Sequence, residues 1–186
     1  MTRLALLAAL LLPALMPTLA GAEAPYAGLD TRPIAALSDA EIADLRAGRG
    51  MGFALPAELN GYPGPRHVLD LAETLALDAD QRAAVEAVFA AMEAGAQALG
   101  PRVIAAEAAL DRLFAEGTAD PASVRAATAE AAAARADLRA VHLEAHLATL
   151  PILTRHQRHL YAEARGYGAS HGHGDKHGHK HGHGAH

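Results

Sequence analysis

Apolar residues recur every three or four positions along most of the chain, a spacing that predicts helices rather than strands. The longest stripe lies between Asp78 and Glu116, and its members are Val85, Phe89, Met92, Ala96, Leu99, Val103, Ala106, Leu110 and Leu113. Pro101 lies inside this stripe, where it removes one backbone hydrogen bond and should kink the helix without ending it. Asp120-Pro121 is an N-cap followed by proline, which predicts a second long helix to about Leu150. The two should form an antiparallel α-hairpin.

Shorter elements precede the hairpin. A capping box at Ser38–Glu41 predicts a short helix that ends at Gly48. Glycine and proline punctuate residues 48–65, which predicts a loop, and a second short helix should follow from Arg66 to Leu75. Residues 23–37 should be an extended leader. The expected fold class is therefore all-α.

One helical hairpin alone encloses no core. Alanine dominates residues 126–136, so the second long helix allows close helix approach but buries little apolar area per residue. The apolar stripes should therefore be covered by a second copy of the chain, which predicts a homodimer.

The first 22 residues have the features of a cleaved secretory signal peptide. One basic residue precedes an apolar run broken by Pro13 and Pro17, and Leu19–Ala22 supplies the small residues of a cleavage site. The run is too short for a membrane anchor, and the chain has no cysteine to carry a lipid or form a disulfide. These features predict an exported protein of the bacterial periplasm.

Charge argues against nucleic acid as a partner. Removal of the signal peptide removes Arg3 and leaves 15 basic against 21 acidic residues, a formal net charge of −6. The chain also has no tryptophan and no cluster of aromatic residues for stacking on bases.

The same short pattern occurs at both ends of the predicted hairpin. Leu77–Gln81 and Leu153–Gln157 each place an apolar residue before an N-cap Asp or Thr, with glutamine at the third helical position. This pairing resembles the periplasmic LTxxQ-motif family over roughly Ala36 to Tyr167, with Asp78 standing where the family has threonine. The family includes Spy- and CpxP-like chaperones, zinc-resistance-associated proteins and CnrX-type heavy-metal sensors. The resemblance implies a four-helix, hairpin-shaped fold that dimerises, and a function in chaperoning or metal sensing.

The C-terminal segment 168–186 indicates metal binding more directly. Its histidines are separated mostly by glycine, and they are His171, His173, His177, His179, His181, His183 and His186. Such a sequence cannot bury apolar surface, so it should be a disordered tail in the absence of ligand. Neutral imidazole binds Zn, Ni and Cu(II), and glycine lets several rings reach one ion. A purification tag or an inert spacer is the alternative, but Asp175 and Lys180 interrupt the pattern in a way that a simple tag does not.

A second candidate metal site lies in the predicted helices. His142 and His146 are four residues apart and so share one helix face, a spacing that suits two ligands to one ion. The alternative is a pair of structural histidines. His67 is a candidate third ligand, because CnrX-type sensors draw ligands from an early and a late helix, although Glu73 or Glu93 could equally complete the site. His156 and His159 should lie on a solvated face.

No enzymatic motif accompanies these histidines. Glu144 stands two residues from both His142 and His146, about 200° around the helix, so it cannot act as the base of a zinc hydrolase. The sequence therefore predicts a non-enzymatic heavy-metal-binding protein, acting as sensor or buffer, with metal ions as ligands. A membrane-bound sensor or anti-sigma protein is a candidate partner. The alternatives are an ATP-independent chaperone that holds unfolded clients, for which Arg125, Arg135, Arg139, Arg155 and Arg158 would supply positive charge, and an adaptor whose tail is incidental.

Overall fold

A computed structural model describes residues 26–167 of the 186-residue chain. Within this range the chain forms six α-helices, two short 3-10 helices and no strand, which confirms the all-α fold class. None of the helices in this range is both long and apolar enough to cross a membrane. The predicted signal peptide 1–22 and tail 168–186, with all seven tail histidines, lie outside the described residues.

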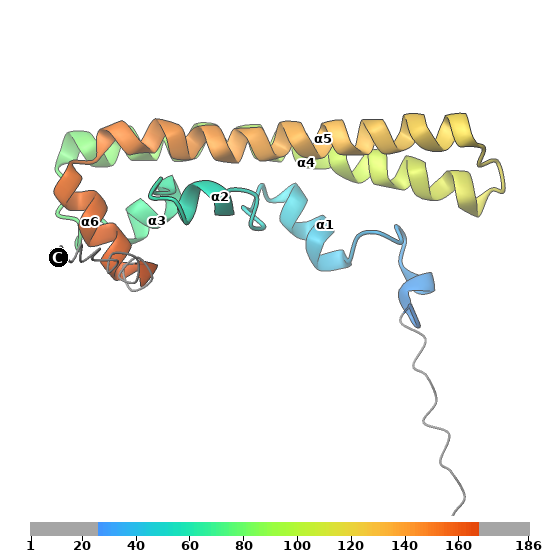
Figure 1. Cartoon of the computed structure of the whole chain (residues 1–186), viewed down its shortest axis with the longest axis horizontal. Coiled ribbons are helices and arrows are strands. Elements are labelled where there is room, and N and C mark those ends of the chain that lie inside the picture. Colours follow the sequence, from blue (N-terminus) through green and yellow to red (C-terminus); the bar gives the residue numbers. More distant parts are fainter. Residues whose placement is uncertain (1–25, 168–186) are drawn as a thin grey trace, which may run out of the picture.

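The predicted α-hairpin is present. Helix α4 (Ala79–Ala115) and helix α5 (Pro121–Thr149) lie side by side along most of their length, as Figure 1 shows. Side chains of Asp78 and Asp120 cap the two helices at their first turns. Helix α4 continues through Pro101, as the sequence predicted.

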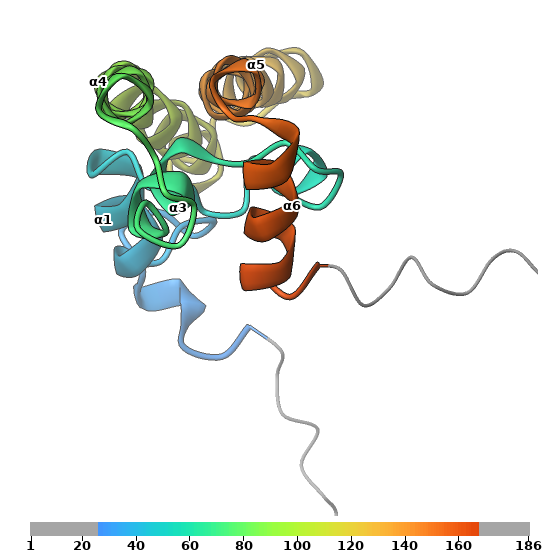
Figure 2. The ribbon, with the colours of Figure 1, turned by 90° about the vertical axis from the view of Figure 1, so that its left-hand side faces the viewer.

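Four shorter helices pack below the hairpin. They are α1 (Asp39–Arg46), α2 (Leu55–Glu58), α3 (Pro65–Asp70) and α6 (Arg155–Ala164). Seen along the hairpin in Figure 2, α1 and α3 lie beneath α4, whereas α6 descends from the end of α5.

The sequence prediction was wrong in three places. Helix α2 lies inside the predicted loop 48–65, because a single turn that begins at Leu55-Pro56 is too short for an apolar period to reveal. Helix α3 ends at Asp70 rather than Leu75, and turns continue to residue 76. The leader is not fully extended, since residues 29–31 form a 3-10 helix.

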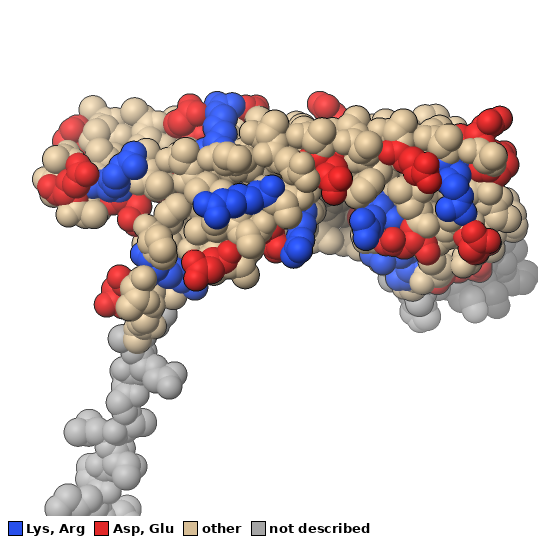
Figure 3. Space-filling view, turned by 180° about the vertical axis from the view of Figure 1, so that it is seen from behind, with Lys and Arg blue, Asp and Glu red and all other residues tan. Residues whose placement is uncertain are grey.

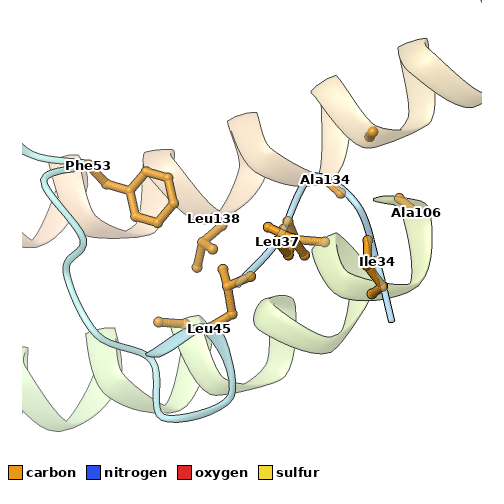
Figure 4. Close-up of a cluster of buried hydrophobic side chains, with 10 residues drawn as sticks. Ile34, Leu37, Leu45, Phe53, Ala106, Ala134 and Leu138 are labelled. Atoms are coloured by element: carbon orange, nitrogen blue, oxygen red, sulfur yellow. The ribbon is translucent and has the colours of Figure 1, made fainter. Parts of the chain in front are cut away.

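The chain itself covers part of the apolar face of the hairpin. Figure 4 shows Ile34, Leu37 and Leu45 from the N-terminal segment packed against α4 and α5. Phe53 joins the same buried cluster from the loop after α1. A partner chain is therefore not required to cover all of the stripe, and the homodimer stays a prediction.

Gly100 allows α1 to approach α4 closely. A Cβ atom at this position would lie 1.9 Å from the carbonyl oxygen of Leu45, so only glycine fits. The contact fixes the C-terminal end of α1 on the middle of α4 and thereby positions the loop that follows α1.

The two glutamine motifs meet at the end of the hairpin. Side-chain amides of Gln81 and Gln157 donate to one another at 2.8–2.9 Å, and each also donates to a backbone carbonyl, of Ile152 and Leu75 respectively. Each glutamine also completes the capping box of its own helix. The paired motifs therefore join the start of α4 to the start of α6.

Candidate metal centre

His146 is a buried histidine with one ring nitrogen held in place. Its Nδ1 donates to the carbonyl oxygen of Tyr62 at 2.7 Å, which leaves Nε2 as the ring nitrogen available to a ligand. No hydrogen bond among residues 26–167 engages Nε2, and this atom faces Gly64, where a Cβ would lie only 2.9 Å away. The ring therefore lies against the Gly64 backbone, and a side chain at position 64 would collide with it.

Glu58, on α2, is a buried carboxylate beside this ring. Its Oε1 accepts from the hydroxyls of Tyr161 at 2.5 Å and Tyr167 at 3.0 Å, and its Oε2 accepts from the Gly64 amide at 3.2 Å. Burial alone would raise the pKa of Glu58, but the tyrosine hydrogen bonds and two nearby histidines lower it below its ordinary value of 4.5. Glu58 is therefore a buried anion. Its Oε2 lies 3.7 Å from Nδ1 of His146.

His67, in the first turns of α3, lies on the other side of Glu58. Its Nδ1 is 3.5 Å from Glu58 Oε1, and its side chain is 41% exposed. Burial and the nearby Arg165 lower the pKa of His67 below 6.5, so the ring is neutral at pH 7. Glu58 thus lies next to Nδ1 of both histidines.

A pocket of about 640 Å³ opens between α3, α4 and the loop after α1. We call it the histidine pocket, because His67 and His146 both line it. Its remaining lining residues are Ala47, Gly48, Arg49, Gly50, Gly64, Pro65, Arg66, Phe89, Met92, Glu93 and Gln97. Imidazole, thioether and carboxylate groups therefore face one space that is large enough for a hydrated ion.

His142 has different surroundings from His146, although both lie on the buried face of α5. Its ring stacks on Phe53 with centroids 5.6 Å apart, and the residue is 2% exposed. Among the described residues, its Nε2 is the one buried side-chain polar atom without a hydrogen-bond partner. Burial lowers the pKa of His142 below 6.5. The structure therefore brings His67 and His146 together at the pocket, but His142 is not among the residues that line it.

The other candidate residues named from the sequence either line the histidine pocket or are exposed elsewhere. Glu93 lines the histidine pocket, whereas the Glu73 side chain is 96% exposed and pairs with Arg82. His156 is exposed, and so is His159, which pairs with Glu163. Within residues 26–167, no group of three or more His, Cys, Asp or Glu residues is arranged to hold a metal ion.

Sequence reasoning missed Glu58 and the groups that hold it. Glu58 lies in a stretch rich in glycine and proline, where an acidic residue is ordinarily solvated. The tyrosines that contact it, Tyr161 and Tyr167, are more than 100 residues away along the chain. Only the docking of α6 beside α2 brings these groups together.

Comparison with known proteins gives one match. A family model described as heavy-metal resistance, which belongs to the LTxxQ/Spy–CpxP-like group, matches residues 50–159. This range includes Glu58, His67, His142 and His146. No curated protein and no solved structure matches the chain.

Proposed function

The chain belongs to the heavy-metal resistance family, and from this membership we propose that it binds divalent transition metal ions in the periplasm, as a sensor or buffer rather than as an enzyme. Two regions would share the binding. The tail histidines would capture ions, and the histidine pocket would hold one ion within the helical domain.

The orientation of His146 carries this proposal. Metal-bound histidines ordinarily donate their second ring N–H to a carbonyl or carboxylate, which fixes the tautomer and leaves the other nitrogen for the ion. Nδ1 of His146 already donates to Tyr62, with Glu58 beside it, and within residues 26–167 no hydrogen bond engages Nε2 of this ring, which lines the histidine pocket. The ring is therefore oriented as a ligand before any ion arrives.

His67 is the best-placed second ligand from the helical domain. It lines the same pocket, and its Nδ1 lies near the same carboxylate. Two imidazole ligands suit Zn, Ni and Cu(II), and the remaining positions of such an ion are open to water, to Glu93 or to Met92. The sequence pattern paired His142 with His146 instead. Replacement of His142 therefore distinguishes an ion on His67 and His146 from an ion on His142 and His146.

Isothermal titration with Zn, Ni and Cu(II) tests the proposal. The full-length protein should bind several ions, and a form without Ser170–His186 should retain one site. His146→Ala should remove that site, whereas His159→Ala, at an exposed position outside the pocket, should keep it. Equal binding by the His146→Ala and His159→Ala forms would refute an ion at the histidine pocket.

A chaperone function is the second candidate. Figure 3 shows a molecule hollowed on the side below the hairpin, and Leu55 of α2 and Leu59 directly after it are more than half exposed. Two of the arginines that would supply positive charge for client binding are engaged within the fold instead. Arg135 lies over the Phe53 ring, and Arg139 donates to the Phe53 carbonyl. In Figure 3 basic and acidic residues also alternate on the visible face. Suppression of client aggregation by the tail-deleted protein, independent of metal, would favour the chaperone.

A further inference from the structure

We propose that Glu58 couples the histidine pocket to the C-terminal end of α6, so that an ion bound by His67 weakens the contact between Glu58 and Tyr167. The inference rests on metal binding in the histidine pocket. It adds what that binding changes elsewhere in the chain.

One oxygen of Glu58 already accepts two hydrogen bonds, and two further polar groups lie close to it. A carboxylate offers about four lone-pair positions over two oxygens, hence about two on Oε1. The hydroxyls of Tyr161 at 2.5 Å and Tyr167 at 3.0 Å occupy them. Nε of Arg165, which donates to Tyr167, lies 3.3 Å from the same oxygen, and Nδ1 of His67 lies 3.5 Å from it. A donor that becomes stronger must therefore displace another.

An ion on His67 would strengthen one of these donors. Binding through Nε2 places the ring proton on Nδ1 and draws electron density from the ring, which makes that N–H a better donor. Nδ1 then approaches Oε1 and takes one position. Tyr161, buried and at the shortest distance, keeps the other, so Tyr167 gives way.

The displaced group lies at the base of the histidine-rich segment. The Tyr167 hydroxyl also accepts from the Arg165 guanidinium at 3.1–3.2 Å, so the two side chains should leave Glu58 together. The sequence continues directly into Gly168 and the histidines from His171 onward. Occupancy of the pocket would therefore be transmitted to the point where that segment joins the folded domain.

NMR of the full-length protein with ¹³Cζ-labelled tyrosine tests the coupling. The chain has four tyrosines, so each signal can be assigned from one Tyr→Phe variant. Zinc should move the Tyr167 signal toward that of exposed Tyr26 and leave the Tyr161 signal nearly in place. In Glu58→Gln, which removes the shared charge, zinc should no longer move the Tyr167 signal.

A reciprocal measurement separates coupling from a purely structural contact. Two coupled equilibria affect one another by the same factor, so Tyr167→Phe should tighten zinc binding at His67 by roughly fivefold or more. The affinity is read from the His67 ring signals, assigned with His67→Ala, and Tyr26→Phe is the matched control with unchanged affinity. Tyr167→Phe with unchanged or weaker zinc affinity would overturn the coupling alone. His67 signals that do not respond to zinc would overturn both the coupling and metal binding in the pocket.

Discussion

Replacement of Gly100 by alanine should separate α1 from α4. The added Cβ would lie 1.9 Å from the Leu45 carbonyl oxygen and 2.6 Å from its carbon, and both are backbone atoms. An ordinary carbon–oxygen contact is roughly 3.3 Å, so α1 must move by more than ~1 Å. Leu45 is 1% exposed, and its displacement opens the core that it shares with Leu37 and Leu138.

The magnitude follows from two costs and one gain in the free energy of unfolding. Forced overpacking of a core costs about 1–3 kcal/mol, and lost burial of a leucine costs about 1.5–3 kcal/mol when complete. Alanine stabilises a helix interior by about 1 kcal/mol relative to glycine. The expected net loss for Gly100→Ala is therefore about 2 kcal/mol, which at roughly 3 °C per kcal/mol lowers the melting temperature by about 6 °C.

Gly95 provides a matched control in the same helix. A Cβ there would meet only the two methyl groups of the Val141 side chain, at 3.2 and 3.6 Å, and this side chain can adjust. Gly95→Ala should therefore be neutral or stabilise the chain by up to about 1 kcal/mol. Urea unfolding followed by circular dichroism compares the two variants. If Gly100→Ala were as stable as Gly95→Ala, the close approach of α1 to α4 would be refuted.

Four further predictions follow from the structure. Gln157→Ala leaves the buried Leu75 carbonyl without its donor and should cost about 1–3 kcal/mol in urea unfolding, whereas exposed Gln97→Ala should cost about 0.5 kcal/mol or less. Because burial lowers the pKa of His142 below 6.5, the unfolded chain binds that proton more readily, so the melting temperature should fall between pH 7 and pH 5, and by less in His142→Phe. Deletion of Ser170–His186 should remove most of the metal capacity in isothermal titration and leave the melting temperature of the metal-free protein nearly unchanged; a large drop would mean that the segment packs on the fold. Light scattering at micromolar concentration should show a dimer, and a compact monomer would contradict that assembly.

Local sequence determines the hairpin and its ends, which is why these parts were predictable. Asp78 and Asp120 cap helices through contacts within three residues of themselves, and the apolar stripe of α4 repeats often enough to identify a helix. The two glutamine motifs were visible as capping boxes. Their contact with each other was not, because the amide bonds between Gln81 and Gln157 exist only after α6 folds back beside α4.

Of the residues at the candidate site, only the histidines could be identified from the sequence. The spacing of His142 and His146 placed both on one face of α5, which the structure buries, but it could not show that one ring stacks on Phe53 while the other lines a pocket. That difference depends on where residues 48–65 lie, a stretch without any apolar period. The buried charge of Glu58 depends on the same stretch.

Thermal unfolding of the tail-deleted protein with zinc tests the central claim most directly, because an ion that binds only the folded state stabilises that state. At a hundredfold excess of zinc over Kd the stabilisation should be about 2.7 kcal/mol. It should disappear in His146→Ala and His67→Ala, remain in His142→Ala, and weaken toward pH 5 as the imidazoles become protonated. A loss in His142→Ala with retention in His67→Ala would place the ion on the α5 pair instead. No stabilisation by zinc, nickel or copper would contradict metal binding by the helical domain.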